Sequence, residues 1–113
     1  MKSYPLNPEE VKELDVLDKK YPKVHFVHVI QDIEYGVNAG VTVAWYRNYP
    51  NSRLIYFTVS SLNPTDTYIR KRGRLLTLKQ IDEGKVLNIS VGDRYTSSIN
   101  NTFKRMFTRL VLT

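Results

Sequence analysis

The most chemically versatile residues of this 113-residue chain are its two histidines and two nearby acids. His28, Asp32 and Glu34 share one face if their segment is a strand, and an imidazole with carboxylates can bind a metal or exchange protons. His25 would point to the opposite face, so the two histidines cannot hold one metal together. A strand end with a polar face explains the same residues. We therefore expect a non-enzymatic protein with no catalytic residue, no metal site and no cofactor.

Positive charge is concentrated in one short segment. Residues 67–81 hold five Lys or Arg and no acid, whereas the first 66 residues hold seven basic and eight acidic residues. Cations spaced within two helical turns can neutralise adjacent phosphates or meet an acidic protein surface. For direct nucleic-acid binding, the candidate residues are Arg70, Lys71, Arg72, Arg74, Lys79, Lys104, Arg105 and Arg109. The net charge of +6 excludes a DNA mimic, which needs an acidic surface.

Aromatic residues are more numerous than a core of this size needs. The chain has eight Tyr and one Trp, and several of them lie near predicted loops. Tyr, Trp and Arg dominate the binding energy of protein interfaces, so a protein partner is our leading hypothesis and nucleic acid the alternative. The predicted partner-binding residues are Tyr49, Tyr68, Arg70, Lys71, Arg72 and Arg74.

The stretch from Asn63 to Arg74 is the most distinctive in the sequence. After a strand, Asp66 is followed by Tyr68, a basic cluster, Gly73 and Arg74. Over residues 53–76 this pattern resembles small accessory proteins of tailed bacteriophages, although Leu75 and the residues after it depart from the small residues of that pattern. The resemblance implies phage origin more than any activity. Together with the expected protein partner, it leads to the hypothesis of an accessory protein that binds and inhibits or redirects a host machine: a defence nuclease complex, RNA polymerase or another nucleic-acid-processing enzyme.

Composition excludes several other classes. The chain has no cysteine, which excludes a disulfide framework, a thiolate zinc site and a cysteine nucleophile. No apolar stretch approaches the length of about 18 residues that spans a bilayer, and the first residues do not form a signal peptide. We therefore expect no membrane partner, a location in the cytoplasm of a host bacterial cell, and a single domain over residues 1–113.

Hydrophobic spacing predicts three helices and four strands. The helices are expected at about residues 8–20, 66–82 and 97–110. The strands are expected at about residues 23–35, 41–47, 53–60 and 85–91. Asn7 and Pro8 suit a helix start, and residues 36–40 suit a turn between the first two strands.

The second helix has an alternative. Gly73 in its middle also suits a hairpin turn, but the residues before Gly84 favour a helix that ends there. The order of elements predicts an α+β fold, with an antiparallel sheet of three to four strands and helices packed on one face.

Overall fold

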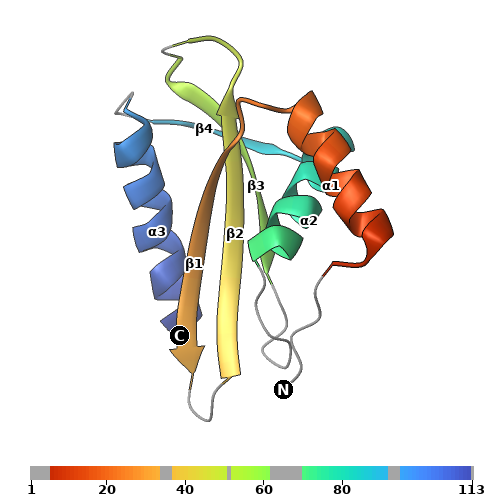
Figure 1. The fold of residues 1–113 in the computed structure, drawn as a ribbon. Coiled ribbons are helices and arrows are strands. Elements are labelled where there is room, and N and C mark those ends of the chain that lie inside the picture. Colours follow the sequence, from red (N-terminus) through yellow and green to blue (C-terminus); the bar gives the residue numbers. More distant parts are fainter. Residues whose placement is uncertain (1–5, 34–36, 51, 62–69, 92–94, 113) are drawn as a thin grey trace.

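The computed structural model of the chain has an α+β fold built on one antiparallel sheet (Figure 1). It describes residues 6–33, 37–50, 52–61, 70–91 and 95–112. The helices in these ranges are α1 (Pro8–Lys20), α2 (Arg70–Asp82) and α3 (Thr96–Leu112). The strands in them are β1 (His25–Ile33), β2 (Val37–Arg47), β3 (Leu54–Ser61) and β4 (Leu87–Ser90). The predicted element types and their order are confirmed.

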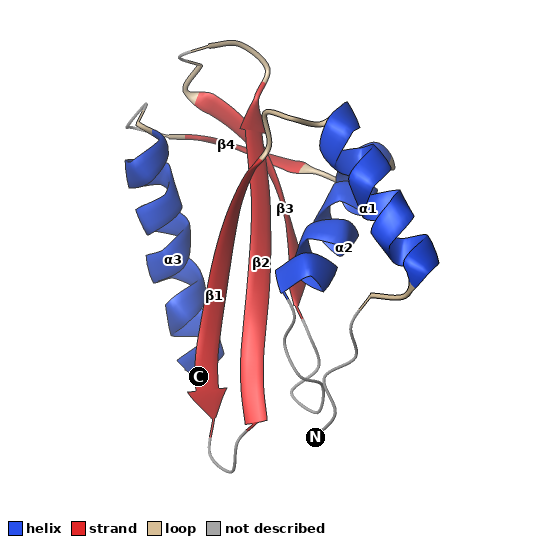
Figure 2. Cartoon of the chain, in the orientation of Figure 1, coloured by secondary structure: helices blue, strands red, loops and turns tan. Residues whose placement is uncertain are grey.

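The sheet is a meander in the order β1-β2-β3-β4, in which each strand pairs with the next in antiparallel fashion (Figure 2). Trp45 of β2 lies between His25 of β1 and Phe57 of β3. The short β4 pairs only with the first half of β3, from Leu54 to Phe57. β4 is therefore one edge of the sheet and β1 the other.

The first turn is shorter than the sequence predicts. We expected residues 36–40 to connect the strands, but β2 already begins at Val37, which pairs with Ile33. The ladder continues through Gly40, which lies opposite Ile30. Pairing with β1 supplies backbone hydrogen bonds along residues 37–40, and this outweighs the weak strand preference of glycine.

Helices cover both faces of the sheet, so the prediction of a single covered face is wrong. α3 lies on one side, and α1 and α2 lie together on the other (Figure 1). Side chains alternate between faces along a strand, and both alternating sets include apolar residues here. Val43 and Trp45 pack toward α3, while Ala44 packs toward α1 and α2.

The α3 face of the sheet is an apolar core. Trp45 is fully buried there, and its indole Nε1 donates a hydrogen bond of 2.8 Å to the Asn100 side chain. Phe103 of α3 fills the centre and packs against Phe57. The remaining buried members of this core are Val27, Val29, Val41, Val43, Ile55 and Ile99.

α2 is a helix rather than a hairpin, and it approaches β2 closely at Gly73. A Cβ on Gly73 would lie 2.0 Å from Oγ1 of Thr42, so no larger residue fits. Gly84 has a φ of 75°, and the neighbouring amides bond back to the last turn, which confirms the predicted helix stop. Of the predicted helical start, residues 66–69 lie outside the described residues.

The start of α1 follows the prediction as well. The Asn7 side chain accepts a bond of 2.8 Å from the amide of Glu10, whose carboxylate accepts one from the amide of Asn7. This reciprocal cap fixes where the helix begins.

Within the ranges given above, none of the helices is both long enough and apolar enough to cross a bilayer.

Candidate functional site

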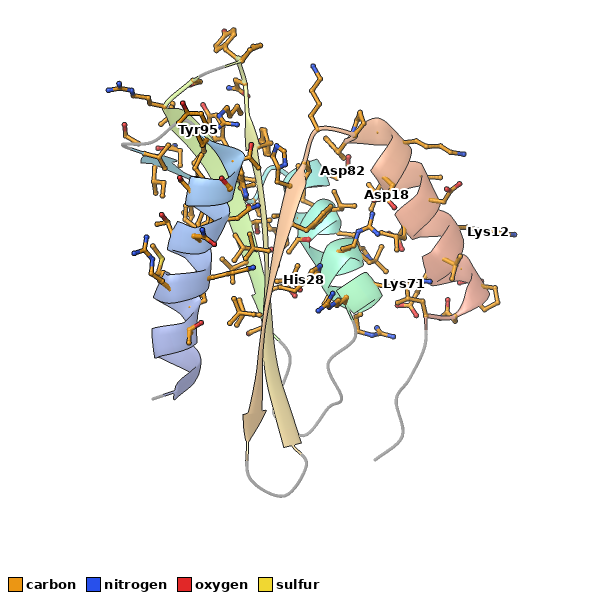
Figure 3. The ribbon with its side chains drawn as sticks, turned by 60° about the vertical axis from the view of Figure 1, so that its left-hand side comes forward. Lys12, Asp18, His28, Lys71, Asp82 and Tyr95 are labelled. Carbon is orange, nitrogen blue, oxygen red and sulfur yellow. The ribbon has the colours of Figure 1, made fainter. Side chains whose placement is uncertain are left out.

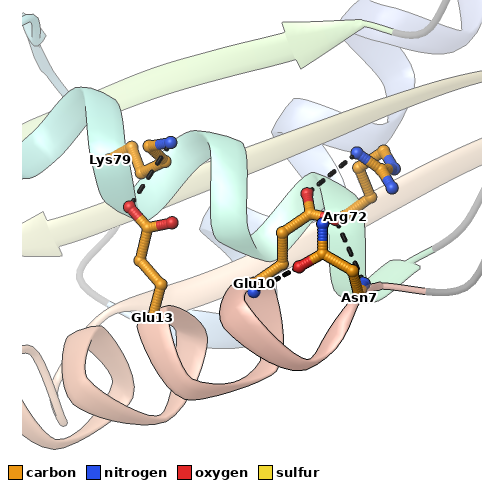
Figure 4. Close-up of polar contacts among 5 residues, drawn as sticks. All are labelled: Asn7, Glu10, Glu13, Arg72 and Lys79. Atoms are coloured by element: carbon orange, nitrogen blue, oxygen red, sulfur yellow. Dashed lines mark hydrogen bonds and ion pairs between the residues drawn. The ribbon is translucent and has the colours of Figure 1, made fainter.

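Three residues of the basic segment are paired with acids of α1. Arg72 lies 3.2 Å from the carboxylate of Glu10, and Lys79 lies 3.3 Å from that of Glu13 (Figure 4). Both contacts join α2 to α1. The acidic character of the first helix and the basic character of residues 67–81 therefore largely cancel in the folded chain.

Arg74 contacts both α1 and the sheet. Its guanidinium Nη2 donates to the carboxylate of Asp18 at 2.7 Å and lies 5.0 Å from the ring centre of Phe26. Its Nε is buried and has no hydrogen-bond partner among the described residues. Arg74 is therefore part of the seam between α1, α2 and the sheet.

Arg70 and Lys71, at the start of α2, are exposed instead (Figure 3). Neither forms an ion pair with any residue that the structure describes. Tyr68, predicted beside them, lies outside the described residues. The predicted partner-binding set is thus divided into two exposed cations, two paired arginines and the distant Tyr49.

The alternative nucleic-acid set does not form one patch. Lys104 and Arg105 are exposed on α3, which covers the opposite face of the sheet from α2. The side chain of Arg109 lies outside the described residues. A single strand of nucleic acid would have to cross an edge of the sheet to reach both groups.

His28 lies beneath α2 rather than in an open site. Its Nδ1 is 3.1 Å from Oγ1 of Thr42, and the residue is half-buried. Burial, followed by the charges of Arg70 and Arg74, lowers the pKa of His28 from 6.5 to about 4. The imidazole is therefore neutral at physiological pH.

Of the two acids proposed with His28, Asp32 can be placed along β1. Asp32 follows His28 by four residues on β1, a separation of about 13 Å along a strand. Glu34 lies outside the described residues, and the described ones contain no group of three or more side chains able to hold a metal. These positions give no support to a carboxylate and imidazole centre.

A different group of residues forms a hollow where β1 begins and β2 ends. Its volume is about 320 Å³. We call it the turn-end surface, and it is lined by Lys23, His25, Arg47, Asn48, Tyr49 and Pro50. Tyr49 is 73% exposed, and Lys23 is exposed as well. Pairing of His25 with Trp45 brings the start of β1 beside the end of β2 and so assembles the group.

Trp45 packs against two residues of the turn-end surface. The ring of His25 stacks on the indole at 4.4 Å, and the guanidinium of Arg47 lies 5.0 Å from the indole centre. Arg47 Nε also donates to the carbonyl of Ser52 at 3.3 Å. These contacts fix the orientations of the His25 imidazole and the Arg47 guanidinium.

The electrostatic character of this surface is positive. Partial burial, and then the charge of Arg47, lowers the pKa of His25. No Asp or Glu occurs in residues 21–31 or 46–55, the two stretches that form the hollow. Lys23 and Arg47 are thus the charged residues that these two stretches place in the lining of the hollow.

Of the residues that line the turn-end surface, only Tyr49 was predicted from the sequence as a binding residue. Lys23 and His25 are far along the chain from Arg47, and none of the three belongs to a dense run of basic residues such as 70–74. The signal that could have found them was the strand register, because pairing His25 with Trp45 places Arg47 near Lys23.

Neither a scan against protein-family models nor searches of curated proteins and of solved structures found a match to this chain.

Proposed function

We propose that this chain is a non-enzymatic binding protein that docks an acidic surface of a partner protein against its turn-end surface. The observation that supports this most strongly is the hollow itself, which gathers Lys23, Arg47 and the exposed ring of Tyr49 at two neighbouring strand ends. Complementary charge speeds association and selects partners, while aromatic and arginine side chains supply most of the binding energy.

Preorganisation adds to this proposal. Arg47 is oriented by Trp45 and by the Ser52 carbonyl, so less side-chain entropy is lost when it meets a partner. Tyr49 has few rotatable bonds and a large surface that becomes buried on contact. The paired Arg72 and Arg74 would instead have to give up their contacts with α1.

The phage resemblance of residues 53–76 supplies the biological context of the proposal. An accessory protein of a bacteriophage would act in the cytoplasm of the host cell, and its partner would be a host macromolecular machine. We propose inhibition or redirection of such a machine, for which a defence nuclease complex, RNA polymerase or another nucleic-acid-processing enzyme is the candidate.

Affinity capture from host extract tests this function. The bait variants are Arg47→Glu and Tyr49→Ala, and Lys12→Glu is the matched control because Lys12 is exposed on α1 (Figure 3). We expect one stoichiometric host protein to be captured by the wild type and by the control, and lost with either turn-end variant. Equal capture by all four baits, or no stoichiometric partner at all, would contradict the proposal.

Direct nucleic-acid binding remains a second candidate because Arg70 and Lys71 are exposed and close together. Gel-shift titrations at two salt concentrations test it. Phosphate contacts predict binding that weakens steeply with salt and disappears in an Arg70→Glu, Lys71→Glu double variant. Binding that survives this double variant would rule out the start of α2 as the nucleic-acid site.

A further inference from the structure

We propose that two copies of this chain associate through the outer edge of β4, so that their sheets join into one across a two-fold axis. The interface is separate from the turn-end surface, because none of the residues that line that hollow belongs to β4. Self-association at β4 therefore goes beyond the docking of a partner protein at the turn end.

The strand register decides which main-chain groups of β4 face away from the sheet. Val91 donates its amide to the carbonyl of Arg53 at 2.7 Å, which makes these opposite residues a hydrogen-bonded pair. Hydrogen-bonded and non-hydrogen-bonded pairs alternate along an antiparallel ladder, so Ile89 also bonds to β3. The amides and carbonyls of Asn88 and Ser90 therefore point outward, where β4 has no further strand in the described sheet.

β4 also lacks the features that protect many edge strands from pairing. Such edges are guarded by a charged side chain, a proline or a bulge. Residues 86–92 contain no charged residue and no proline, and β4 pairs with β3 in an unbroken register. The opposite edge, β1, carries Asp32 and packs against α3. Of the two edges of the described sheet, β4 is therefore the one suited to accept another strand.

The hydrogen-bonding pattern of β4 is complementary to itself. If two β4 strands run antiparallel with Ile89 opposite Ile89, then Asn88 of each copy lies opposite Ser90 of the other. Both residues can exchange amide and carbonyl bonds across the axis, so every outward main-chain group of β4 gains a partner. Their side chains also face one another, and an amide and a hydroxyl can hydrogen-bond.

Leu87 favours a second copy over an unrelated strand. Its side chain is 66% exposed, although Ile89 and Val91, which alternate onto the same face of the sheet, pack against the core under α3. In the symmetric pairing, Leu87 lies opposite Val91 of the second copy in a non-hydrogen-bonded pair, where side chains come closest. The second copy thus covers apolar surface at both ends of the interface.

Sedimentation equilibrium of the full chain, at concentrations from about 10 μM to about 1 mM, tests the proposal. We expect a reversible equilibrium between monomer and dimer. Leu87→Lys places a charge against Val91 of the second copy and should weaken association about tenfold or more. Val16→Lys is the matched control, because Val16 is 62% exposed on α1, and it should leave the equilibrium unchanged. Leu87 is exposed to a similar extent, so both variants should fold.

Amide hydrogen exchange then locates the interface on the strand. The amide of Ile89 bonds to β3 in the monomer and the dimer alike, whereas those of Asn88 and Ser90 gain a partner only in the dimer. We expect exchange at Asn88 and Ser90 to slow about tenfold as the dimer becomes dominant, with little change at Ile89.

Three results would each overturn the inference. They are a chain that stays monomeric over the whole concentration range, a dimer that Leu87→Lys weakens no more than Val16→Lys does, and a dimer in which exchange at Asn88 and Ser90 is not slowed. The second and third results would place the contact between the copies elsewhere on the molecule.

Discussion

The basic residues of α2 and those of the turn-end surface differ in the contacts that hold them. On α2, Arg72, Arg74 and Lys79 are paired with acids of α1, a helix far away in sequence. At the turn end, Arg47 lies over the indole of Trp45 and donates to the Ser52 carbonyl, and Lys23 is exposed beside it. A run of basic residues in a sequence is therefore a poor guide to the charge of the folded surface, because tertiary contacts pair some of these residues with acids.

The two regions also differ in how tightly they are packed. α2 rests on β2 through Gly73 and Thr42, and its charged side chains bridge to α1. The turn end is a hollow beside an exposed tyrosine. The first region is expected to respond to mutation mainly through stability, and the second mainly through binding.

The largest effect is expected from Gly73→Ala. The added Cβ would lie 2.0 Å from Thr42 Oγ1 and 2.8 Å from its Cβ, so α2 must move away from the sheet. We expect a loss of about 3 kcal/mol in the free energy of unfolding, measured by urea denaturation. Gly84→Ala is the control, because it meets no atom within 4 Å and carries only the strain of its positive φ, about 1 kcal/mol. Equal losses for the two variants would contradict the close approach.

The next effect is a dependence of stability on pH through His28. Its folded-state pKa of about 4 lies below the value of 6.5 for an unperturbed histidine. Between these values the unfolded chain binds a proton that the folded chain does not, so stability is full above pH 6.5 and falls as the pH drops toward 4. We expect a loss of about 2 kcal/mol over this window after allowance for solvent screening.

Urea denaturation of wild type and His28→Gln across this pH range measures the effect. Gln cannot titrate, so its curve should be flatter than that of the wild type, while His25→Gln should remove a smaller part of the slope. A wild-type slope that is unchanged by His28→Gln would show that other groups cause the acid sensitivity.

A smaller effect on stability, with a gain of binding, is expected when the acids of α1 are neutralised. The triple variant Glu10→Gln, Glu13→Gln, Asp18→Asn releases three cations of α2 but keeps the side-chain cap of the helix. The pairs are partly exposed, so we expect a loss of only about 1 kcal/mol in total. Gel shifts at low salt should show new binding to oligothymidine.

Asp15→Asn is the matched control, since its partner Lys19 lies on the same helix. If the wild type already bound oligothymidine as tightly as the triple variant, the α1 acids would not be masking the α2 cations.

The smallest effect on stability is expected from Tyr49→Ala. Its ring is 73% exposed, so truncation should change the free energy of unfolding by less than about 0.5 kcal/mol. Tyr46→Ala, by comparison, removes a half-buried ring stacked on Tyr56 and should destabilise the chain more. If Tyr49→Ala were as destabilising as Tyr46→Ala, Tyr49 would be part of the core rather than a docking residue.

Most of the fold could be predicted from the sequence because its signals are local. The Asn7 cap, the Gly84 stop and the alternation along residues 53–60 each depend on neighbours in the chain. The placement of helices on both faces of the sheet could not be predicted. It depends on which of the two alternating sets of strand side chains packs against which helix. Gly73 shows the same limit: its cost in a helix is visible in the sequence, but its fit against Thr42 is not.

The candidate site was less predictable for a related reason. Tyr49 suited an interface by residue type, but the cations beside it are brought together only by the pairing of β1 with β2. Conversely, Arg72 and Arg74 stood out by spacing, and their acidic partners come from α1. Tertiary pairing, which neither composition nor periodicity contains, decides both outcomes.

The most direct test is to map where an acidic peptide binds, by recording amide NMR spectra of the full chain during titration with hexaglutamate. We expect the shift changes to be concentrated at Lys23, His25 and residues 47–49, with residues 70–79 little affected. Changes concentrated at residues 70–79, with the turn-end signals unmoved, would contradict the assignment of the binding surface to the turn end.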